Sequence, residues 1–295
     1  GDRDGPRGRL YLFAQFQAAR EGDDDGGRLI AVDPESGAWQ LVRPLKSNIF
    51  SISPDGTKLA SGDYENRNGY HRLTSVWIIE LARPDAAPRT ICPFGDWAIC
   101  SGDGSELIVP LLVSDLGEEP SRWEHWRMNV DGTNRARLPL PASHQAMAWS
   151  PDGRWLATVS SDHPDARGNH VYIMRPDGTG RRRMSSEDIN AHARFSPDSR
   201  RLAFVQRGVL VTMNLDGSER RELYRARDRK VSLSGSAWSP DGRHLACVAE
   251  DWDRDAEWRR HQPRNYRILI VNVEDGSERT HRIPDVLFLD GTYWI

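Results

Sequence analysis

"GSAWSPDGRHLACVAE", residues 235–250, places a tight turn between two stretches in which apolar and polar residues alternate. Pro240 fixes φ at a central turn position, Asp241 can hydrogen-bond to the backbone that follows it, and Gly242 tolerates a positive φ. The alternation on both sides is typical of half-buried β-strands. The stretch therefore predicts a β-hairpin.

The same hairpin recurs along the chain. A close copy, "QAMAWSPDGRWLATVSS", occupies residues 145–161, and others are "SISPDGTKLASG" from Ser51, "CSGDGSELIVP" from Cys100 and "FSPDSRRLAFV" from Phe195. The turn aspartates, separated by 43 to 49 residues, are Asp55, Asp103, Asp152, Asp198 and Asp241. A repeat length in this range is the signature of a repeat architecture.

A second turn follows in most repeats. Its copies begin at residues 32, 129, 175, 214 and 273 and read "VDPESG", "NVDGTN", "RPDGTG", "NLDGSE" and "VEDGSE", with β-rich runs such as "HVYIM" before them. Two hairpins per repeat give four antiparallel strands, which is the blade of a β-propeller. The sequence thus predicts an all-β fold in which residues 1–295 form a single domain.

The two ends of the sequence supply parts of one blade. "RLYLFAQF" and "GGRLIAVDPESGAWQLVR" provide later strands without an opening strand, while "LDGTYWI" at 289–295 matches "LSGSAWS" at 233–239. We expect the C-terminal strand to pair with the N-terminal strand as the innermost strand of the first blade. This arrangement gives six four-stranded blades in a closed ring and leaves neither edge exposed.

The turn motif resembles the Asp-containing repeats of TolB-like propellers, and the resemblance extends over nearly the whole chain. It implies a bacterial protein of this fold that docks a protein partner at the mouth of its channel. Propellers of the prolyl-oligopeptidase group belong to the same class and precede an α/β-hydrolase domain with a Gly-x-Ser-x-Gly elbow. That motif is absent from these residues.

Charge and composition narrow the classes of partner. The net charge of −3 arises from 40 basic and 43 acidic residues that are mixed along the chain, which disfavours nucleic acid. No apolar run is long enough for membrane insertion. We expect a monomer, periplasmic or extracellular if a signal or preceding domain was removed and cytoplasmic otherwise. The three cysteines make no metal-binding pattern, although Cys92 and Cys100 could pair across neighbouring strands.

Strand order assigns the connections to two faces. Both sets of tight turns share one face, and the long connections at 15–28, 63–75, 115–126, 161–170 and 250–267 share the other, where blade 5 has only "QRG" at 206–208. Long loops on a rigid scaffold commonly carry recognition. We expect a ligand-binding rim of aromatic side chains: Tyr64, Tyr70, Trp123, Trp252 and Trp258. The alternative is that these rings pack on their own loops.

The connections between blades deliver polar residues to the channel mouth. We expect a ligand-binding ring of these side chains: Asn48, Asp96, His144, Asn190, His192, Ser234 and Asp290. The alternative is that a hydrated mouth merely tolerates polar residues. The set has no evident activated nucleophile, so no catalytic residue and no cofactor are assigned.

Two functional hypotheses follow. The first is a non-catalytic binding module that recognises a protein or carbohydrate-type ligand at the channel mouth and the long-loop face. The second is a metal-dependent polysaccharide lyase or hydrolase that uses His144 and His192, because oligogalacturonate lyases resemble TolB-like propellers and use metal-binding histidines. A metal site would need a third good ligand beside these two.

Overall fold

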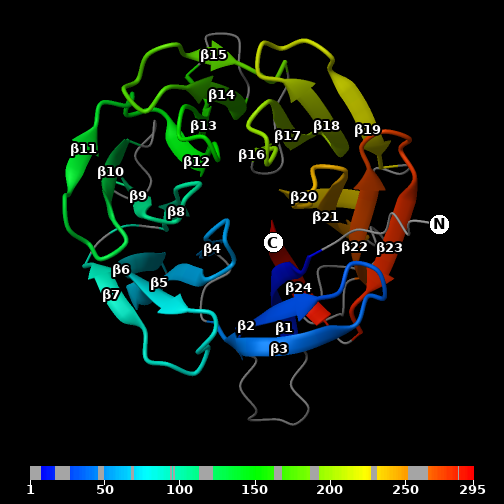
Figure 1. Cartoon of the computed structure of the whole chain (residues 1–295), viewed down its shortest axis with the longest axis horizontal. Helices are drawn as coiled ribbons and strands as arrows, with labels where there is room; N and C mark the ends of the chain where they lie inside the picture. Colours follow the sequence, from blue (N-terminus) through cyan, green and yellow to red (C-terminus); the bar gives the residue numbers. More distant parts are fainter. Residues whose placement is uncertain are drawn as a thin grey trace.

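The computed structural model of the chain describes residues 8–16, 27–45, 50–67, 70–93, 95, 97–112, 122–162, 168–186, 193–226, 231–251, 265–284 and 286–295. These residues form 24 β-strands in six four-stranded sheets, arranged as blades around a central axis (Figure 1). The predicted all-β, six-bladed propeller is confirmed. No helix among these residues is long and apolar enough to cross a membrane.

The blades are numbered along the chain, and each is given from its innermost to its outermost strand. Blade 1 contains β24 (Val286–Trp294), β1 (Leu10–Phe16), β2 (Gly27–Val32) and β3 (Trp39–Pro44). Blade 2 contains β4 (Phe50–Ile52), β5 (Lys58–Arg67), β6 (Tyr70–Glu80) and β7 (Arg89–Cys92). Blade 3 contains β8 (Ile99–Cys100), β9 (Glu106–Leu112), β10 (Trp123–Asn129) and β11 (Ala136–Leu138).

The second half of the ring repeats this order. Blade 4 contains β12 (Gln145–Trp149), β13 (Leu156–Ser160), β14 (His170–Met174) and β15 (Arg182–Arg183). Blade 5 contains β16 (Arg194–Phe195), β17 (Arg201–Gln206), β18 (Val209–Asn214) and β19 (Arg221–Arg225). Blade 6 contains β20 (Val231–Trp238), β21 (His244–Asp251), β22 (Asn265–Asn272) and β23 (Glu278–Arg282).

The ring closes through the two ends of the chain, as the sequence predicts. β24 pairs antiparallel with β1, from Leu10 opposite Trp294 to Phe16 opposite Val286. The pairing continues past the strands, since the Arg9 amide donates to the Ile295 carbonyl at 2.6 Å and the Ile295 amide donates to the Arg9 carbonyl at 3.0 Å. Blade 1 is thus assembled from segments at opposite ends of the sequence.

The hydrophobic core is divided among the six junctions between neighbouring blades. Each of the six apolar clusters joins two blades; one, for example, packs Leu10 and Ile30 of blade 1 against Ile268 of blade 6. Alternating residues of a strand face the blade on either side, so both faces of every sheet are buried. Every blade therefore depends on both of its neighbours.

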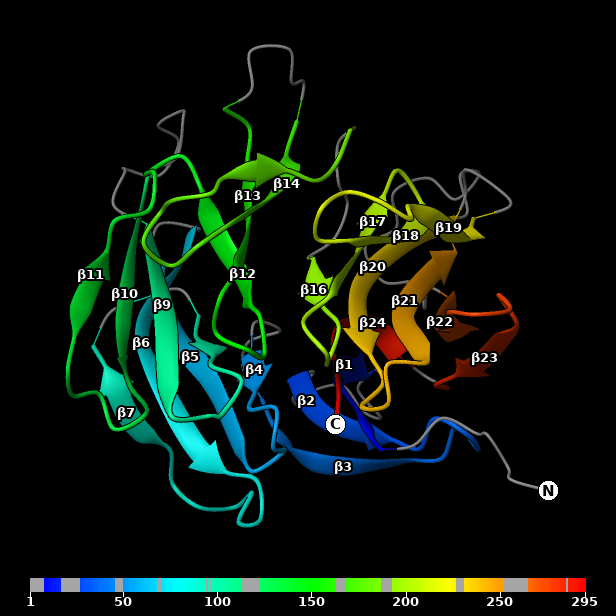
Figure 2. The same ribbon diagram turned by 45° about the horizontal axis from the view of Figure 1, so that its top comes forward.

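The two sets of tight turns lie on one face of the ring, called here the tight-turn face. Backbone hydrogen bonds join the turns within a blade, as from Leu81 to Thr57 at 2.7 Å and from Val273 to Arg243 at 2.8 Å. Figure 2 shows the ring tilted, with the turn that joins β8 to β9 and the one that ends β6 on its lower side. The face assignment made from strand order is therefore correct.

Each aspartate of the repeated turn holds its own hairpin. In blade 3 the carboxylate of Asp103 accepts hydrogen bonds from the Ser101 hydroxyl at 2.6 Å and the Ser105 amide at 3.0 Å. The same pair of bonds, from the serine two residues before and the amide two residues after, occurs at Asp55, Asp152, Asp198 and Asp241. These carboxylates point into the turns they stabilise.

The lowered pKa of Asp103 predicts a loss of stability in acid. The hydroxyl of Ser101 and the amide of Ser105 lower the pKa of Asp103 from 3.8 to about 2. A carboxyl with a lower pKa in the folded state contributes stability that is complete above its unfolded pKa and disappears as the pH falls through its folded pKa. We therefore expect the free energy of unfolding to fall between about pH 4 and about pH 2, measured by urea denaturation. An unchanged midpoint across that range would contradict this.

All five long connections predicted from the sequence overlap a strand at one or both ends, and the overlap is greatest in blades 2 and 3. The segment 63–75 continues the hairpin of blade 2, with β5 and β6 paired as far as Arg67 opposite Tyr70. In blade 3, β10 begins at Trp123, inside the predicted loop 115–126. The aromatic residues of these segments, Tyr64, Tyr70, Trp123 and Trp126, are compatible with a strand as well as with a loop. In blade 5, Arg207 and Gly208 make the short connection, with φ of 47° and 74°.

All three cysteines are buried as free thiols. Cys92 and Cys100 belong to the same apolar cluster between blades 2 and 3, but they form no disulfide. Burial raises the pKa of Cys100 to about 11 and that of Cys247 to about 12. The thiols therefore serve as small apolar groups of the core.

Candidate functional site

A cavity of about 330 Å³ lies in the channel at the tight-turn face. Every blade contributes to its lining through the end of its innermost strand, and the turn prolines Pro54, Pro151, Pro197 and Pro240 surround it. In blades 2–6, the residue two positions before the turn serine lines the cavity. In blade 1 the equivalent residue belongs to β24. The residues at this position are Ser51, Ile99, Ala148, Arg194, Ala237 and Tyr293.

Arg194 extends from β16 toward two other blades. Its Nη1 donates to the carbonyl oxygens of Met147 at 3.3 Å and Ala193 at 3.2 Å, and its Nη2 donates to the Tyr293 hydroxyl at 3.4 Å. The guanidinium carbon lies 5.3 Å from the centroid of the Tyr293 ring. Among the described lining residues, Arg194 alone is charged. The described part of the channel therefore holds a positive side chain with no carboxylate side chain in the cavity lining.

Most of the predicted channel-mouth residues lie outside the described side chains. Asn48, Asp96, Asn190 and His192 belong to undescribed positions, and only the backbone of Asp290 is described. Ser234 and Asp290 were expected in connections between blades, but they lie within β20 and β24. Both strands run past the connection because each has a bulge at a glycine of positive φ, Gly235 and Gly291.

His144 is placed immediately before β12 and is fully buried. Its Nδ1 lies 2.8 Å from Thr158 Oγ1, and its Nε2 lies 3.0 Å from Nη1 of Arg181 and 3.3 Å from Oδ2 of Asp162. Burial lowers the pKa of His144, with the charge of Asp162 opposing this effect. One nitrogen of the neutral ring donates and the other accepts, with Thr158 beside Nδ1 and with Arg181 and Asp162 beside Nε2. Both ring nitrogens are thus engaged by the protein.

A metal site would require His144 to exchange these partners. No group of three or more His, Cys, Asp or Glu side chains suited to a metal ion occurs among the described residues. His192, the other predicted ligand, falls outside them. The described surroundings of His144 are accordingly those of a hydrogen-bonded core histidine.

Of the five aromatic residues predicted for the rim, only Trp123 has a side chain that the structure describes. Trp123 begins β10, and its half-buried ring lies 5.4 Å from that of Trp97, at an angle of 59°. Tyr64 and Tyr70 lie in β5 and β6, but their side chains are outside the description, as are Trp252 and Trp258 altogether. Trp123 therefore packs within its own blade while part of its surface stays accessible.

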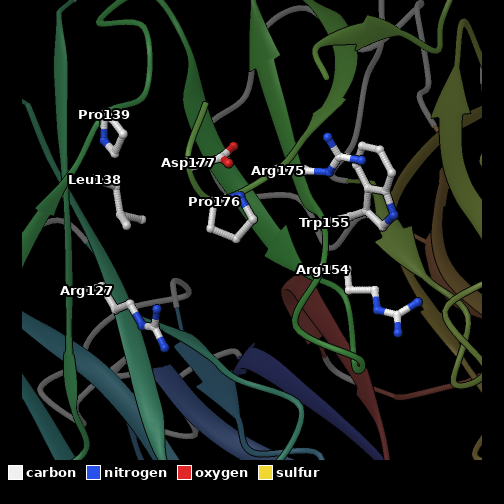
Figure 3. A pocket seen from close by; sticks show the side chains of 8 residues that line it. All are labelled: Arg127, Leu138, Pro139, Arg154, Trp155, Arg175, Pro176 and Asp177. Atoms are coloured by element: carbon white, nitrogen blue, oxygen red, sulfur yellow. The ribbon is translucent and has the colours of Figure 1, made fainter. Parts of the chain in front are cut away.

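An open groove of about 620 Å³ separates blades 3 and 4 near the tight-turn face. Figure 3 shows Arg127, Leu138 and Pro139 of blade 3 on one side and the turns of blade 4 on the other. Arg175 stacks on the ring of Trp155, with its guanidinium carbon 5.5 Å from the ring centroid.

The positive charges of this groove are partly balanced by carboxylates. Arg127 pairs with Glu106 through two hydrogen bonds, and the Asp177 carboxylate lies in the same groove. The groove is basic but partly neutralised, in contrast to the channel cavity.

Comparisons with known proteins agree with the fold. The WD domain, G-beta repeat family matches residues 143–163, within blade 4, and no curated protein sequence matches the chain significantly. TolB from Acinetobacter baumannii is similar in structure, with a TM-score of 0.69 and 15% identity over 97% of this chain and 66% of that one.

Two other solved structures are similar over most of the chain. A nidogen/laminin complex has a TM-score of 0.60 and 15% identity, covering 97% of this chain and 98% of that one. Oligogalacturonate lyase in complex with manganese has a TM-score of 0.53 and 14% identity, covering 86% and 72%. At such identities the likeness concerns the fold alone, and in its fold the chain is a TolB-like six-bladed β-propeller.

Proposed function

We propose that the chain is a non-catalytic binding module that recognises a protein or carbohydrate-type ligand at its channel and on the long-loop face. The observation that carries this proposal is the channel cavity, to which all six blades contribute. A volume of about 330 Å³ is within the usual range of ligand pockets. The fold supports a binding role, since TolB and a nidogen/laminin complex share it.

The predicted mouth and rim residues complete this proposal. His144 precedes the inner strand β12, whereas the cavity lies at the far end of the same strand. The mouth and the cavity thus lie toward opposite ends of one channel. Trp123, Trp252 and Trp258 would supply aromatic surface at the rim, where such side chains commonly hold partners and sugars.

Binding by the rim can be measured directly. We expect the chain to bind a member of an oligosaccharide array or an immobilised peptide library, and the double variant Trp252→Ala/Trp258→Ala to bind it at least about tenfold more weakly. Trp39→Ala, which removes an exposed tryptophan from the outer strand β3, is the matched control. Unchanged binding by the double variant would refute the rim, and turnover of the bound ligand would refute a non-catalytic role.

The metal-dependent alternative has less support, because both ring nitrogens of His144 already have protein partners. Elemental analysis of the purified chain distinguishes the two hypotheses. Stoichiometric divalent metal that is lost in the His144→Ala/His192→Ala variant would overturn the binding-module proposal in favour of a lyase or hydrolase.

A further inference from the structure

The channel cavity contains an arginine, Arg194, whose N–H groups are only partly used by the described part of the chain. An arginine has five N–H donors. For Arg194, Nη1 serves two carbonyl oxygens and Nη2 serves the Tyr293 hydroxyl, which leaves the Nε–H and one Nη2–H without an acceptor in the described part of the chain. The Nε–H and the Nη2–H beside it form one edge of the guanidinium plane, spaced to match the two oxygens of a carboxylate.

The same chain shows what this edge binds. Arg127 uses its Nε and Nη2 to hold both oxygens of Glu106, with Nε 2.9 Å from Oε1. Arg194 has the same Nε and Nη2 groups, and no other described side chain that lines the cavity carries a charge. An anion brought by a ligand would therefore meet an unopposed positive charge in a partly dehydrated site, where ion pairing is stronger than at the surface.

The remaining cavity wall indicates an apolar ligand body. Met147, Trp149, Phe195 and Trp238 are among its larger apolar residues. The indole N–H groups are already used, because Trp149 donates to the Gly153 carbonyl and Trp238 donates to the Arg194 carbonyl, each at 3.1 Å. The Tyr293 hydroxyl accepts from Arg194 and retains its own proton for donation. The polar groups thus gather at one place in an otherwise apolar cavity.

We propose that the channel cavity binds a carboxylate carried on an apolar or aromatic body, with the carboxylate held by the Nε–Nη2 edge of Arg194 and the Tyr293 hydroxyl. This inference rests on the proposed binding function and names the chemistry that its channel accepts. Two sources offer this chemistry, namely a free aromatic acid and the C-terminal carboxylate of a peptide that ends in an aromatic residue.

Isothermal titration with matched probes tests the inference and distinguishes the sources. Phenylacetate is compared with phenylacetamide, and the peptide Gly-Gly-Gly-Gly-Phe with its C-terminal amide. We expect at least one acid to bind about tenfold or more tightly than its neutral amide, since a charge-assisted bidentate pair is lost in the amide. Binding of phenylacetate indicates a free acid, and binding of the peptide acid alone indicates a chain end.

Substitutions then assign the binding to Arg194. Arg194→Gln should weaken acid binding about tenfold or more and abolish the preference over the amide, whereas Arg194→Lys keeps the charge without the planar edge and should recover only part of the affinity. Arg182→Gln, on the outer strand β15, is the matched control and should bind like the wild type. Thermal unfolding of each variant verifies that it is folded.

Three results would overturn the inference: no binding of either acid by the folded wild type, equal binding of acids and amides, or wild-type acid binding by both Arg194 variants. None of these three results would change the outcome of the binding experiment with the Trp252→Ala/Trp258→Ala variant. Retained sugar or protein binding at the Trp252 and Trp258 surface would then still support the binding module, with a different use for its channel.

Discussion

Deletion of residues 286–295 is expected to leave the chain unfolded at room temperature. It removes β24, the inner strand of blade 1, together with the buried side chains of Val286, Leu289 and Trp294. Each such side chain contributes about 1.5–3 kcal/mol by burial, and a whole domain is stable by only about 5–15 kcal/mol. The deletion also exposes the edge of β1 and breaks the apolar cluster that joins blades 1 and 6.

Circular dichroism and thermal unfolding measure this effect. A chain that lacks residues 1–7, which precede the paired segment, is the control and should unfold cooperatively like the full sequence. A truncation at residue 285 that kept the melting temperature of the full chain would show that the ring does not need its closing strand.

Gly102→Ala is expected to destabilise the chain by about 3 kcal/mol, although it adds only a single methyl group to one turn residue. The turn of blade 3 has Gly102 where the other repeated turns have proline. A Cβ at this position would lie 1.9 Å from the carbonyl oxygen of Pro151 in the adjacent turn of blade 4. The clash involves backbone on both sides, so two blades would have to separate.

Gly153→Ala is the matched comparison, because Gly153 also lies in a repeated turn but a Cβ there would contact nothing within 4 Å. Because the φ of Gly153 is 73°, the added Cβ should lower the free energy of unfolding by only about 1–2 kcal/mol. Gly102→Pro, which restores the common turn sequence, should also be destabilising. A denaturation midpoint for either Gly102 variant at or above that of Gly153→Ala would refute the close packing.

The fold was predictable because its determinants are local and repeated. Pro, Asp and Gly in "SPDG" fix a turn within a few residues, and the turn serine and amide then satisfy the Asp carboxylate, as at Asp241. Ring closure was predictable from the match between "LDGTYWI" and "LSGSAWS". The extent of β5 and β6 was not, because the polar stretch around Tyr64 carries no alternation that separates an extended hairpin from a loop.

The channel site escaped prediction for a different reason. Arg194 precedes "FSPDS" and reads as an ordinary polar residue of a half-buried strand. Arg194 differs from its equivalents in the other blades by its charge, and this is seen only when the six repeats are aligned by position. The equivalent residues are Ser51, Ile99, Ala148, Ala237 and Tyr293. Such a comparison needs the strand register that places one position of every blade toward the axis. His144, by contrast, attracted attention as a histidine, yet its partners Thr158 and Arg181 are distant in sequence.

Because its three cysteines are buried, the folded ring should react very slowly with thiol reagents. Alkylation and disulfide exchange require the thiolate, and with pKa values of about 11 for Cys100 and about 12 for Cys247 almost none is present at neutral pH. Labelling would therefore proceed through transient opening of the blades, so its rate reports how often the junctions separate. Because none of the three cysteines forms a disulfide, the fold contains no covalent cross-link that a reducing agent would break.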